Sequence, residues 1–309
     1  VLTGYTHETI DQAWTRACEL ANSMAGESFD TAKDLVALIT SEMPFTATAL
    51  TTAIEMLAGT PYLEIDEPKH VPMLALVHET DGPALSDELD RLIAAGYRTL
   101  KIKIGFAADA DLKRVQRIQQ LAHGRASLRL DANQGYDAKS ACRFADALDP
   151  TGIELLEQTC AAGDWQAARE VAAVSAVPMM LDESIYDLSD VDRAAELGAA
   201  RYIKFKLMKA GGLARLVDAL AHIRSRGMEP VLGNGVACDV GCWMEACVAH
   251  GHLNNAGEMN GFLKTEQPFF VQPLAQERDA IKLEPDFAPA LNESAIARYR
   301  EASATFPST

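Results

Sequence analysis

The sequence predicts an α/β protein built around a (β/α)8 barrel of the TIM type. From Val71 onward, short apolar segments typical of strands alternate with amphipathic segments typical of helices, at a spacing of about 25 residues. Such alternation makes consecutive strands parallel. Eight units fit a barrel, although about 190 residues is compact for one. The alternative, an open doubly wound sheet, normally carries a glycine-rich turn after an early strand, and Gly105-Phe106-Ala107 is no such turn.

A helical segment precedes the alternating part. It is rich in Ala, Leu, Glu and Met, with apolar residues at three- and four-residue spacing. Asp30 or Thr31 can cap the second helix, and Gly59-Thr60-Pro61 ends the third. The expected helices cover residues 7–24, 31–41 and 45–58.

The alternating part divides into eight strands and seven helices, and its last strand gives the weakest signal. Several prolines follow, in a mixed segment that we expect to pack against the N-terminal helices. The expected strands cover residues 71–78, 97–105, 127–132, 152–158, 177–183, 201–207, 229–233 and 256–259. The expected helices cover residues 85–95, 108–123, 138–148, 164–174, 188–197, 212–226 and 238–251.

The composition is that of a globular protein, with 309 residues, 48% of them hydrophobic and 23% charged. The formal net charge of −16 argues against nucleic acid or an anionic membrane as a partner, because both require clustered Lys and Arg. No apolar run approaches the ~20 residues that span a bilayer. The first residues lack the pattern of a signal peptide, and we expect a cytoplasmic protein. They also lack an initiator Met, so we expect the natural chain to start earlier.

The six cysteines are scattered along the chain, as expected of reduced thiols in the cytoplasm. Cys238, Cys242 and Cys247 lie close in sequence but lack the paired Cys-x-x-Cys spacing of a metal site. We expect them to pack in the core or beside a pocket.

Acidic residues end three consecutive expected strands, namely Asp131, Glu157 and Asp182 on the third, fourth and fifth. In such a barrel the chemistry lies at the carboxyl ends of the strands. A single acid there is commonly a helix cap. Three converging carboxylates repel one another unless a cation lies among them. The pattern therefore predicts a Mg²⁺ site, with Mn²⁺ as the alternative metal.

Lysines occupy the neighbouring strands. Alternate side chains of a strand share a face, so Lys101 and Lys103 lie on one face and the flanking isoleucines on the other. A lone Lys-x-Lys usually marks a solvated face. Here, however, the sixth expected strand carries Lys204 and Lys206, and in an eight-stranded barrel strands two and six lie opposite each other.

These positions predict proton transfer at the α-carbon of a carboxylate substrate. The metal would stabilise the enolate that forms when the α-proton leaves. Lys103 and Lys206 would approach the substrate from opposite sides. A free lysine is a poor base at neutral pH, but partial burial and nearby cations, including Lys101, depress its pKa.

Together, these residues resemble the enolase superfamily and, within it, the muconate lactonizing enzyme subgroup, over residues 44–265. The resemblance implies that Lys103 is a base, with Lys101 as its helper and as a contact to the substrate carboxylate. It implies that Lys206, in the run Lys206-Leu207-Met208-Lys209, is the opposing lysine. It also implies that the metal ligands are Asp131, Glu157 and Asp182, and that Asn133, Glu183 and Glu258 have supporting roles.

The resemblance further implies a partial α+β capping domain. Residues 1–65 would form its helical part, residues 66–262 the barrel, and residues 263–309 a segment that returns to it. The family's capping-domain strands and its mobile specificity loop are expected to precede this chain. The family is often oligomeric, so a homo-oligomer is expected.

Two departures from the family's pattern bear on the substrate. Thr159 stands where many relatives have Pro. Glu258-Met259-Asn260 lacks the Asp-x-Asp with which dipeptide epimerases hold an ammonium group, which argues against a dipeptide substrate. Asn234 and Trp243 follow the seventh strand at the expected mouth of the substrate site. Trp243 could face a substrate cation, although packing within a helix is the commoner role for such a residue.

Two opposed lysines permit several outcomes from one enolate. A racemase or epimerase acting on an amino-acid or proline-derived carboxylate is favoured. A dehydratase of a hydroxyproline-like substrate and a muconate-type cycloisomerase are the alternatives. A binding barrel that retains the metal is the non-enzymatic alternative, but such a protein has no use for two opposed bases. A hydrolase with histidine ligands is disfavoured, because no histidine ends a strand at the right place.

Overall fold

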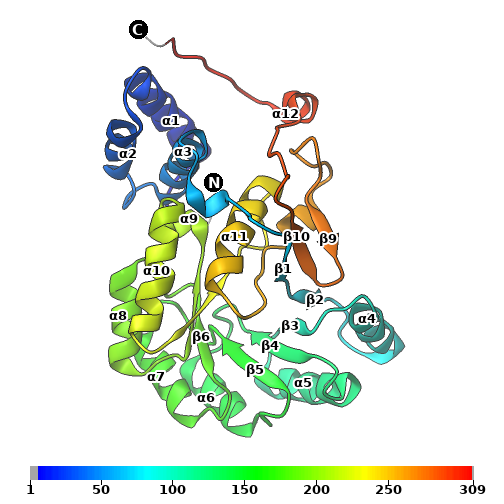
Figure 1. The fold of residues 1–309 in the computed structure, drawn as a ribbon. Helices are drawn as coiled ribbons and strands as arrows, with labels where there is room; N and C mark the ends of the chain where they lie inside the picture. Colours follow the sequence, from blue (N-terminus) through cyan, green and yellow to red (C-terminus); the bar gives the residue numbers. More distant parts are fainter. Residues whose placement is uncertain (1–5, 308–309) are drawn as a thin grey trace.

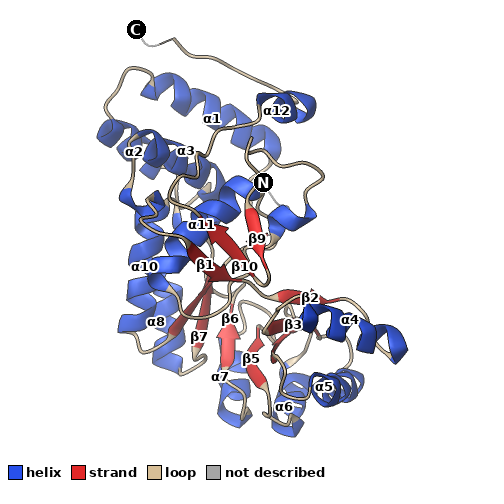
Figure 2. Ribbon diagram, turned by 45° about the vertical axis from the view of Figure 1, so that its right-hand side comes forward, coloured by secondary structure: helices blue, strands red, loops and turns tan. Residues whose placement is uncertain are grey.

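Seven parallel strands form the central sheet of the computed structural model, which describes residues 6–307 (Figure 1). Each strand pairs with the next one in the chain, and the sheet curls into a barrel with the helices outside it (Figure 2). The expected barrel fold is therefore confirmed. The strands are β2 (Ala75–Val77), β3 (Thr99–Lys103), β4 (Ser127–Asp131), β5 (Ile153–Glu157), β6 (Met179–Leu181), β7 (Tyr202–Phe205) and β8 (Glu229–Leu232).

The expected eighth strand is reduced to a single bridge that closes the barrel. Gly257 and Met73 form an isolated parallel bridge. The Glu258 N–H donates to the Leu232 carbonyl oxygen at the end of β8, at 3.0 Å. The Gly257 N–H donates to the Pro72 carbonyl oxygen, at 2.9 Å. The segment thus joins β8 to the residues just before β2.

The first expected strand, at residues 71–78, is wrong as a single element. Its first part belongs to β1 (Lys69–Pro72), which pairs antiparallel with β10 (Ala280–Leu283), and only β2 joins the barrel. Pro72 has no N–H to donate, which limits pairing at the point where the two strands separate. β10 also pairs with β9 (Ala275–Glu277), forming a small three-stranded sheet beside the barrel.

Each strand of the barrel is followed by the helix that the sequence predicts, within a few residues. One short helix, α9 (Leu207–Ala210), was not expected and lies between β7 and its main helix. No described helix is both long and apolar enough to cross a membrane. The main helices are α4 (Gly82–Ala94), α5 (Ala108–Ala122), α6 (Ala138–Ala147), α7 (Trp165–Val174), α8 (Leu188–Leu197), α10 (Leu213–Ser225) and α11 (Asp239–His252).

The N-terminal helices α1 (Ile10–Met24), α2 (Phe29–Ala37) and α3 (Pro44–Leu57) lie over the α9 and α10 side of the barrel (Figure 1). The cap expected for α2 was wrong, because Ser28, not Asp30 or Thr31, accepts the capping hydrogen bond.

Buried Glu55 fixes α3 to the barrel. Its carboxylate accepts hydrogen bonds from the N–H groups of Leu213 and Ala214, at 2.7 and 3.1 Å, at the start of α10. A carboxylate at a helix N-terminus satisfies free N–H groups and complements the helix dipole. This contact orients the helical segment above the carboxyl ends of the strands.

The remaining elements lie before and after the barrel in the chain. Because β10 pairs with β1, the C-terminal segment lies beside the strand that leads into the barrel. The domain limits at residues 65 and 262 stay a prediction. These elements are the short helices η1 (Pro61–Leu63) and η2 (Gly261–Lys264) and the helix α12 (Glu293–Tyr299).

The strand alternation expected for β3 is present. Ile102 and Ile104 are buried in the core between the sheet and its outer helices, whereas Lys101 and Lys103 line a cavity inside the barrel. Gly105 lies two residues after the end of β3 and has a φ of +96°. A Cβ atom there would lie 2.3 Å from the Ala132 carbonyl oxygen, so only glycine permits this close approach of the two chain segments.

Candidate active site

A cavity of about 210 Å³ lies at the carboxyl ends of the barrel strands. Many charged side chains line its wall. Two lysines come from β3, one from β7 and one from the residue just after β7, and the acids come from the ends of other strands and from the closing segment. A larger cavity of about 550 Å³ lies beside α1, away from these strand ends. The charged residues that line the strand-end cavity are Lys101, Lys103, Asp131, Asp182, Lys204, Lys206, Glu258 and Lys264.

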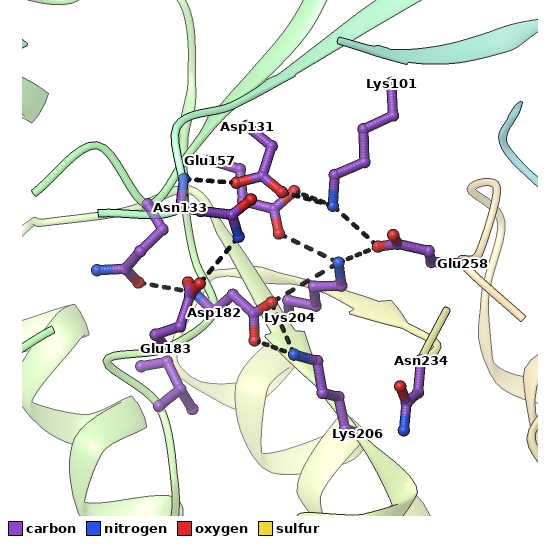
Figure 3. Close-up of polar contacts among 12 residues, drawn as sticks. Lys101, Asp131, Asn133, Glu157, Asp182, Glu183, Lys204, Lys206, Asn234 and Glu258 are labelled. Atoms are coloured by element: carbon purple, nitrogen blue, oxygen red, sulfur yellow. Dashed lines mark hydrogen bonds and ion pairs between the residues drawn. The ribbon is translucent and has the colours of Figure 1, made fainter. Parts of the chain in front are cut away.

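The three expected metal-binding acids lie at one end of the barrel. Asp131 ends β4, Glu157 ends β5, and Asp182 directly follows β6. Each is only 1–2% exposed. Parallel strands direct their carboxyl ends to the same edge, so residues far apart in sequence meet there (Figure 3).

Two buried ammonium groups lie among the acids. Lys101 Nζ lies 2.9 Å from Asp131 Oδ2, from Glu157 Oε2 and from Glu258 Oε2. Lys204 Nζ lies 3.1 Å from Glu157 Oε1 and also contacts Glu258 Oε2 (Figure 3). Charges this deeply buried require such pairing, because burial without a partner is very costly. Glu258, which lies in the segment that closes the barrel, therefore links the two lysines.

The two proposed bases contact different acids. Lys103 Nζ donates to Asp131 Oδ2 at 2.6 Å and to Asn133 Oδ1 at 2.5 Å. Lys206 Nζ lies 2.7 Å from Asp182 Oδ1. Lys103 is the last residue of β3, and Lys206 directly follows β7. These two strands lie four positions apart in the sheet, and both lysine side chains line the strand-end cavity. The Lys103 side chain is 37% exposed, whereas Lys206 is buried.

Burial and charge act against each other on these acids. Burial acts to raise the pKa of Asp131, but Lys101 and Lys103 outweigh it and hold that pKa below its usual value. In Asp182, Lys204 and Lys206 likewise overcome burial and lower the pKa. Glu157 differs, since burial and the neighbouring Asp131 charge raise its pKa. Negative charge is thus least compensated at Glu157, between the other two acids.

The acids fit a hard divalent cation by their chemistry, although their present contacts are to lysines. Within residues 6–307, no three His, Cys, Asp or Glu side chains are already gathered in a form that could hold a metal ion. Two buried oxygens, Glu157 Oε2 and Asp182 Oδ1, nevertheless accept no hydrogen bond of good geometry, despite lysine nitrogens within 2.9 Å. Buried carboxylate oxygens of this kind are the donors that Mg²⁺ prefers.

Asn133 connects the β4 and β6 ends of the site. Its φ of +42° is rare for a residue other than glycine. Its N–H donates to Asp131 Oδ1 at 2.9 Å, and its Nδ2 donates to Glu183 Oε1 at 3.0 Å. The hydrogen bond between Asn133 and Glu183 therefore joins the segments that follow β4 and β6 (Figure 3).

Gln158 was not singled out from the sequence, yet it supports the Asp182 loop. Its Oε1 accepts hydrogen bonds from the N–H groups of Asp182 and Ser184, at 3.0 and 3.1 Å. Its Nε2 donates to Ser184 Oγ and to the Cys160 carbonyl oxygen. The available signal was a polar residue directly after Glu157, at the expected end of the fourth strand.

The two residues expected after the seventh strand lie in different settings, Asn234 in the loop after β8 and Trp243 on α11. Asn234 lines the cavity, and its Nδ2 donates to Met208 Sδ at 3.0 Å. Trp243 is 5% exposed and packs against Phe270 and Phe287, with ring centroids 5.8 and 5.7 Å apart. The expectation that Trp243 packs within the protein is confirmed. The cysteines are all free thiols, and Cys242 and Cys247 are buried as expected.

Sequence reasoning also missed Glu245, on α11 behind Lys206. It is 1% exposed, and its Oε1 accepts a hydrogen bond from the Leu207 N–H at 3.2 Å. Burial raises the pKa of Glu245 to about 7, against the opposing effects of the Leu207 N–H and of Lys206. The available signal was a carboxyl group in the middle of a largely apolar helical segment, Cys242-Trp243-Met244-Glu245-Ala246-Cys247.

This shift predicts a specific pH dependence of stability. The folded protein binds the Glu245 proton more tightly than the unfolded chain, in which the pKa is near 4.5. The contribution of Glu245 to stability is therefore full below pH 4.5 and is lost as the pH rises to 7. We expect the free energy of unfolding of the natural protein, relative to Glu245→Gln, to fall by up to about 3 kcal/mol across this range.

Urea unfolding of both proteins at a series of pH values measures this difference. The matched control is Glu196→Gln, which changes an exposed glutamate on α8 and should give no pH-dependent difference. A difference between the natural protein and Glu245→Gln that stays constant from pH 4.5 to pH 7 would contradict the prediction.

Comparison with known proteins agrees with this geometry. The family model described as enolase C-terminal domain-like matches residues 84–286. An L-Ala-D/L-Glu epimerase from Clostridium acetobutylicum is 35% identical over 159 residues, which are 51% of this chain and 42% of that protein. A chloromuconate cycloisomerase from Cupriavidus pinatubonensis is 29% identical over 224 residues, which are 70% of this chain and 60% of that protein.

A solved structure has a fold similar to that of nearly the whole chain. It is a dipeptide epimerase from Cytophaga hutchinsonii complexed with Mg and the dipeptide D-Ala-L-Val. It superposes with a TM-score of 0.80 at 20% identity, covering 91% of this chain and 80% of that one. The present chain matches less than two thirds of the length of the two curated relatives. The family model nevertheless spans well over half of the chain, and the chain therefore belongs to the enolase C-terminal domain-like family.

Proposed function

We propose that this protein removes the α-proton of a small-molecule carboxylate and returns a proton to the same carbon, acting as a racemase or epimerase. The observation that carries the proposal is the pair Lys103 and Lys206. Both line one 210 Å³ cavity, from positions four strands apart and on either side of buried acids. A binding protein would gain nothing from two such amines, whereas inversion at carbon requires one on each face.

Each lysine of the site has a separate role in this proposal. Lys103 takes the proton from one face of the α-carbon, and Lys206 delivers a proton to the other. Lys101 and Lys204 are buried and are bound to acids on several sides. They set the local charge and hold the carboxylates in place, and Lys101 also attracts the substrate carboxylate.

Asp131, Glu157 and Asp182 would hold a divalent cation, Mg²⁺ or Mn²⁺. Their buried carboxylate oxygens suit it, and a structural neighbour was solved with Mg. When bound, the cation would stabilise the negative charge that develops on the substrate carboxylate as the α-proton leaves. Asn133, Glu183 and Gln158 would keep the acids oriented through their hydrogen bonds to the loops.

An amino-acid or proline-derived carboxylate is the substrate class that we propose. The cavity is small, and Asn234 and Lys264 are among the residues that line it. Relatives named as epimerases support chemistry at an amino-acid α-carbon. The segment Glu258-Met259-Asn260 has Glu258 bound to Lys101 and Lys204, so this acid is not free to hold the ammonium group of a dipeptide.

Proton NMR in D₂O tests the function directly. The full natural protein, with Mg²⁺, is incubated with single enantiomers of amino acids, N-acyl amino acids, betaines and hydroxyprolines. We expect one class to exchange its α-proton for deuterium and to accumulate the opposite enantiomer. Loss of water or ring closure would instead assign a dehydratase or a cycloisomerase. Absence of exchange with every carboxylate would contradict proton abstraction altogether.

A further inference from the structure

A second cavity, of about 330 Å³, lies between the helical segment and the barrel, and the proposed function does not use it. Its lining is mainly apolar and comes from three helices. Phe45 and Ala49 belong to α3, Met208 to α9, and Val240 and Met244 to α11. A volume of this size accommodates a small organic ligand rather than a single water molecule.

One charged residue, Glu245, lines this apolar cavity. Its Oε1 accepts the Leu207 N–H, and the Asn234 N–H also lies close enough to favour the charged form. Its Oε2 accepts no hydrogen bond of good geometry from any described residue. The positive charges of Lys206 and Lys204 also favour the charged form of Glu245. A buried carboxylate oxygen without a partner is costly, so a ligand that supplies a hydrogen-bond donor gains the corresponding free energy.

The second cavity adjoins the strand-end cavity. Asn234 lines both, and its contact with Met208 Sδ forms part of the wall between them. Leu207 and Met208, which directly follow Lys206, also line the second cavity. A ligand in it therefore lies just behind one of the two proposed bases.

We propose that the second cavity binds a short alkylammonium group, with its hydrocarbon part against Met208 and Met244 and its ammonium group on Glu245 Oε2. The apolar lining favours the hydrocarbon part, because its burial removes apolar surface from water. The ammonium group donates a charge-assisted hydrogen bond to Oε2, which has no donor, and places a positive charge beside the negative carboxylate. A free amine and the ammonium end of a substrate's α-substituent share this chemistry. Binding of a substrate's ammonium end rests on the proposed function, whereas binding of a free amine does not.

The test uses the full natural protein labelled with ¹³C at the methionine methyl groups, at pH 8, where Glu245 is charged. Butylamine is titrated while the Met208 and Met244 signals, assigned by Met→Leu variants, are followed. We expect both signals to shift in a saturable manner. We expect Glu245→Gln to weaken butylamine binding on the order of tenfold or more. The neutral probe 1-butanol should bind at least tenfold more weakly than butylamine to the natural protein.

Two further variants test whether butylamine binds in the second cavity rather than elsewhere on the protein. Glu196→Gln, on the exposed face of α8, should leave butylamine binding unchanged. Ala49→Trp places a large side chain at an exposed position of the cavity wall and should abolish binding without disturbing the core. Equal binding of butylamine by the natural protein and Glu245→Gln would overturn the proposal. Equal binding of 1-butanol and butylamine would overturn it as well.

A final arm distinguishes the two sources of the ammonium group. If it belongs to a substrate, 6-aminohexanoate should bind at least tenfold more tightly than butylamine, because its carboxylate can reach the strand-end cavity. If it belongs to a free amine, the two compounds should bind equally. These readouts do not depend on turnover, so binding with no proton exchange would reject the proposed function and retain this site.

Discussion

Lys206→Met is expected to abolish racemisation, with a loss of about 10³-fold or more, because one face of the α-carbon then lacks its proton carrier. Lys103→Met should have the same effect from the other face. Each variant should still exchange the α-proton of one enantiomer, since the remaining lysine can remove and return a proton on its own side. The measurement is proton NMR in D₂O with each enantiomer of the substrate in turn.

The fold should survive the Lys206→Met substitution. Asp182 retains Lys204 and Lys209, whose nitrogens lie 3.7 and 3.5 Å from its carboxylate oxygens. Lys113→Met, which changes an exposed lysine on α5, is the matched control and should racemise normally. Near-normal racemisation by both Lys103→Met and Lys206→Met would exclude the two-base proposal. Loss of exchange for both enantiomers in one variant would assign both proton transfers to a single lysine.

Asp182→Asn is expected to weaken divalent metal binding by at least about 100-fold, because it removes an anionic ligand from the proposed set. It should also destabilise the metal-free protein by roughly 3–5 kcal/mol, since breaking a buried ion pair leaves charges without compensation. Three lysines, Lys204, Lys206 and Lys209, lie within 4 Å of this carboxylate. Isothermal titration with Mn²⁺ measures the first effect, and urea unfolding in EDTA the second.

Asp146→Asn is the matched control for this experiment, because it makes the same chemical change at an exposed position on α6. It should bind Mn²⁺ as the natural protein does and unfold at the same urea concentration. If Asp182→Asn bound Mn²⁺ with the affinity of the natural protein, Asp182 would not be a metal ligand. If its stability were also unchanged, the lysine contacts around Asp182 would contribute nothing to the fold.

The parts of the site that were predictable share one physical origin. In a parallel barrel, the last residue of each strand lies at the same edge whatever the distance in sequence. Asp131, Glu157 and Asp182 could therefore be grouped from their places at the ends of apolar segments. The two-residue period of a strand likewise assigned Lys101 and Lys103 to one face before any contact was known.

Other features depend on partners distant in sequence. The division of residues 71–78 follows from the pairing of β1 with β10, about 200 residues later, and local pattern carries no record of that pairing. The eighth strand is short because its pairing consists of one bridge and a few hydrogen bonds at the barrel seam. The short helix α9 is followed by Gly211 and Gly212, whose φ values of +78° and +142° fit a turn that the helical pattern alone does not specify.

The sequence by itself determined the class of fold, the edge of the barrel that carries the chemistry, and the kinds of group gathered there, because strand and helix periods are local properties. The tertiary structure alone decided how those groups pair. It placed Lys101 and Lys204 between the acids, gave Lys103 and Lys206 to different carboxylates, and put Glu245 behind Lys206 in the wall of a second cavity. Such pairings depend on side chains meeting across the barrel in a buried, low-dielectric space, where distances of a few ångströms set the interaction.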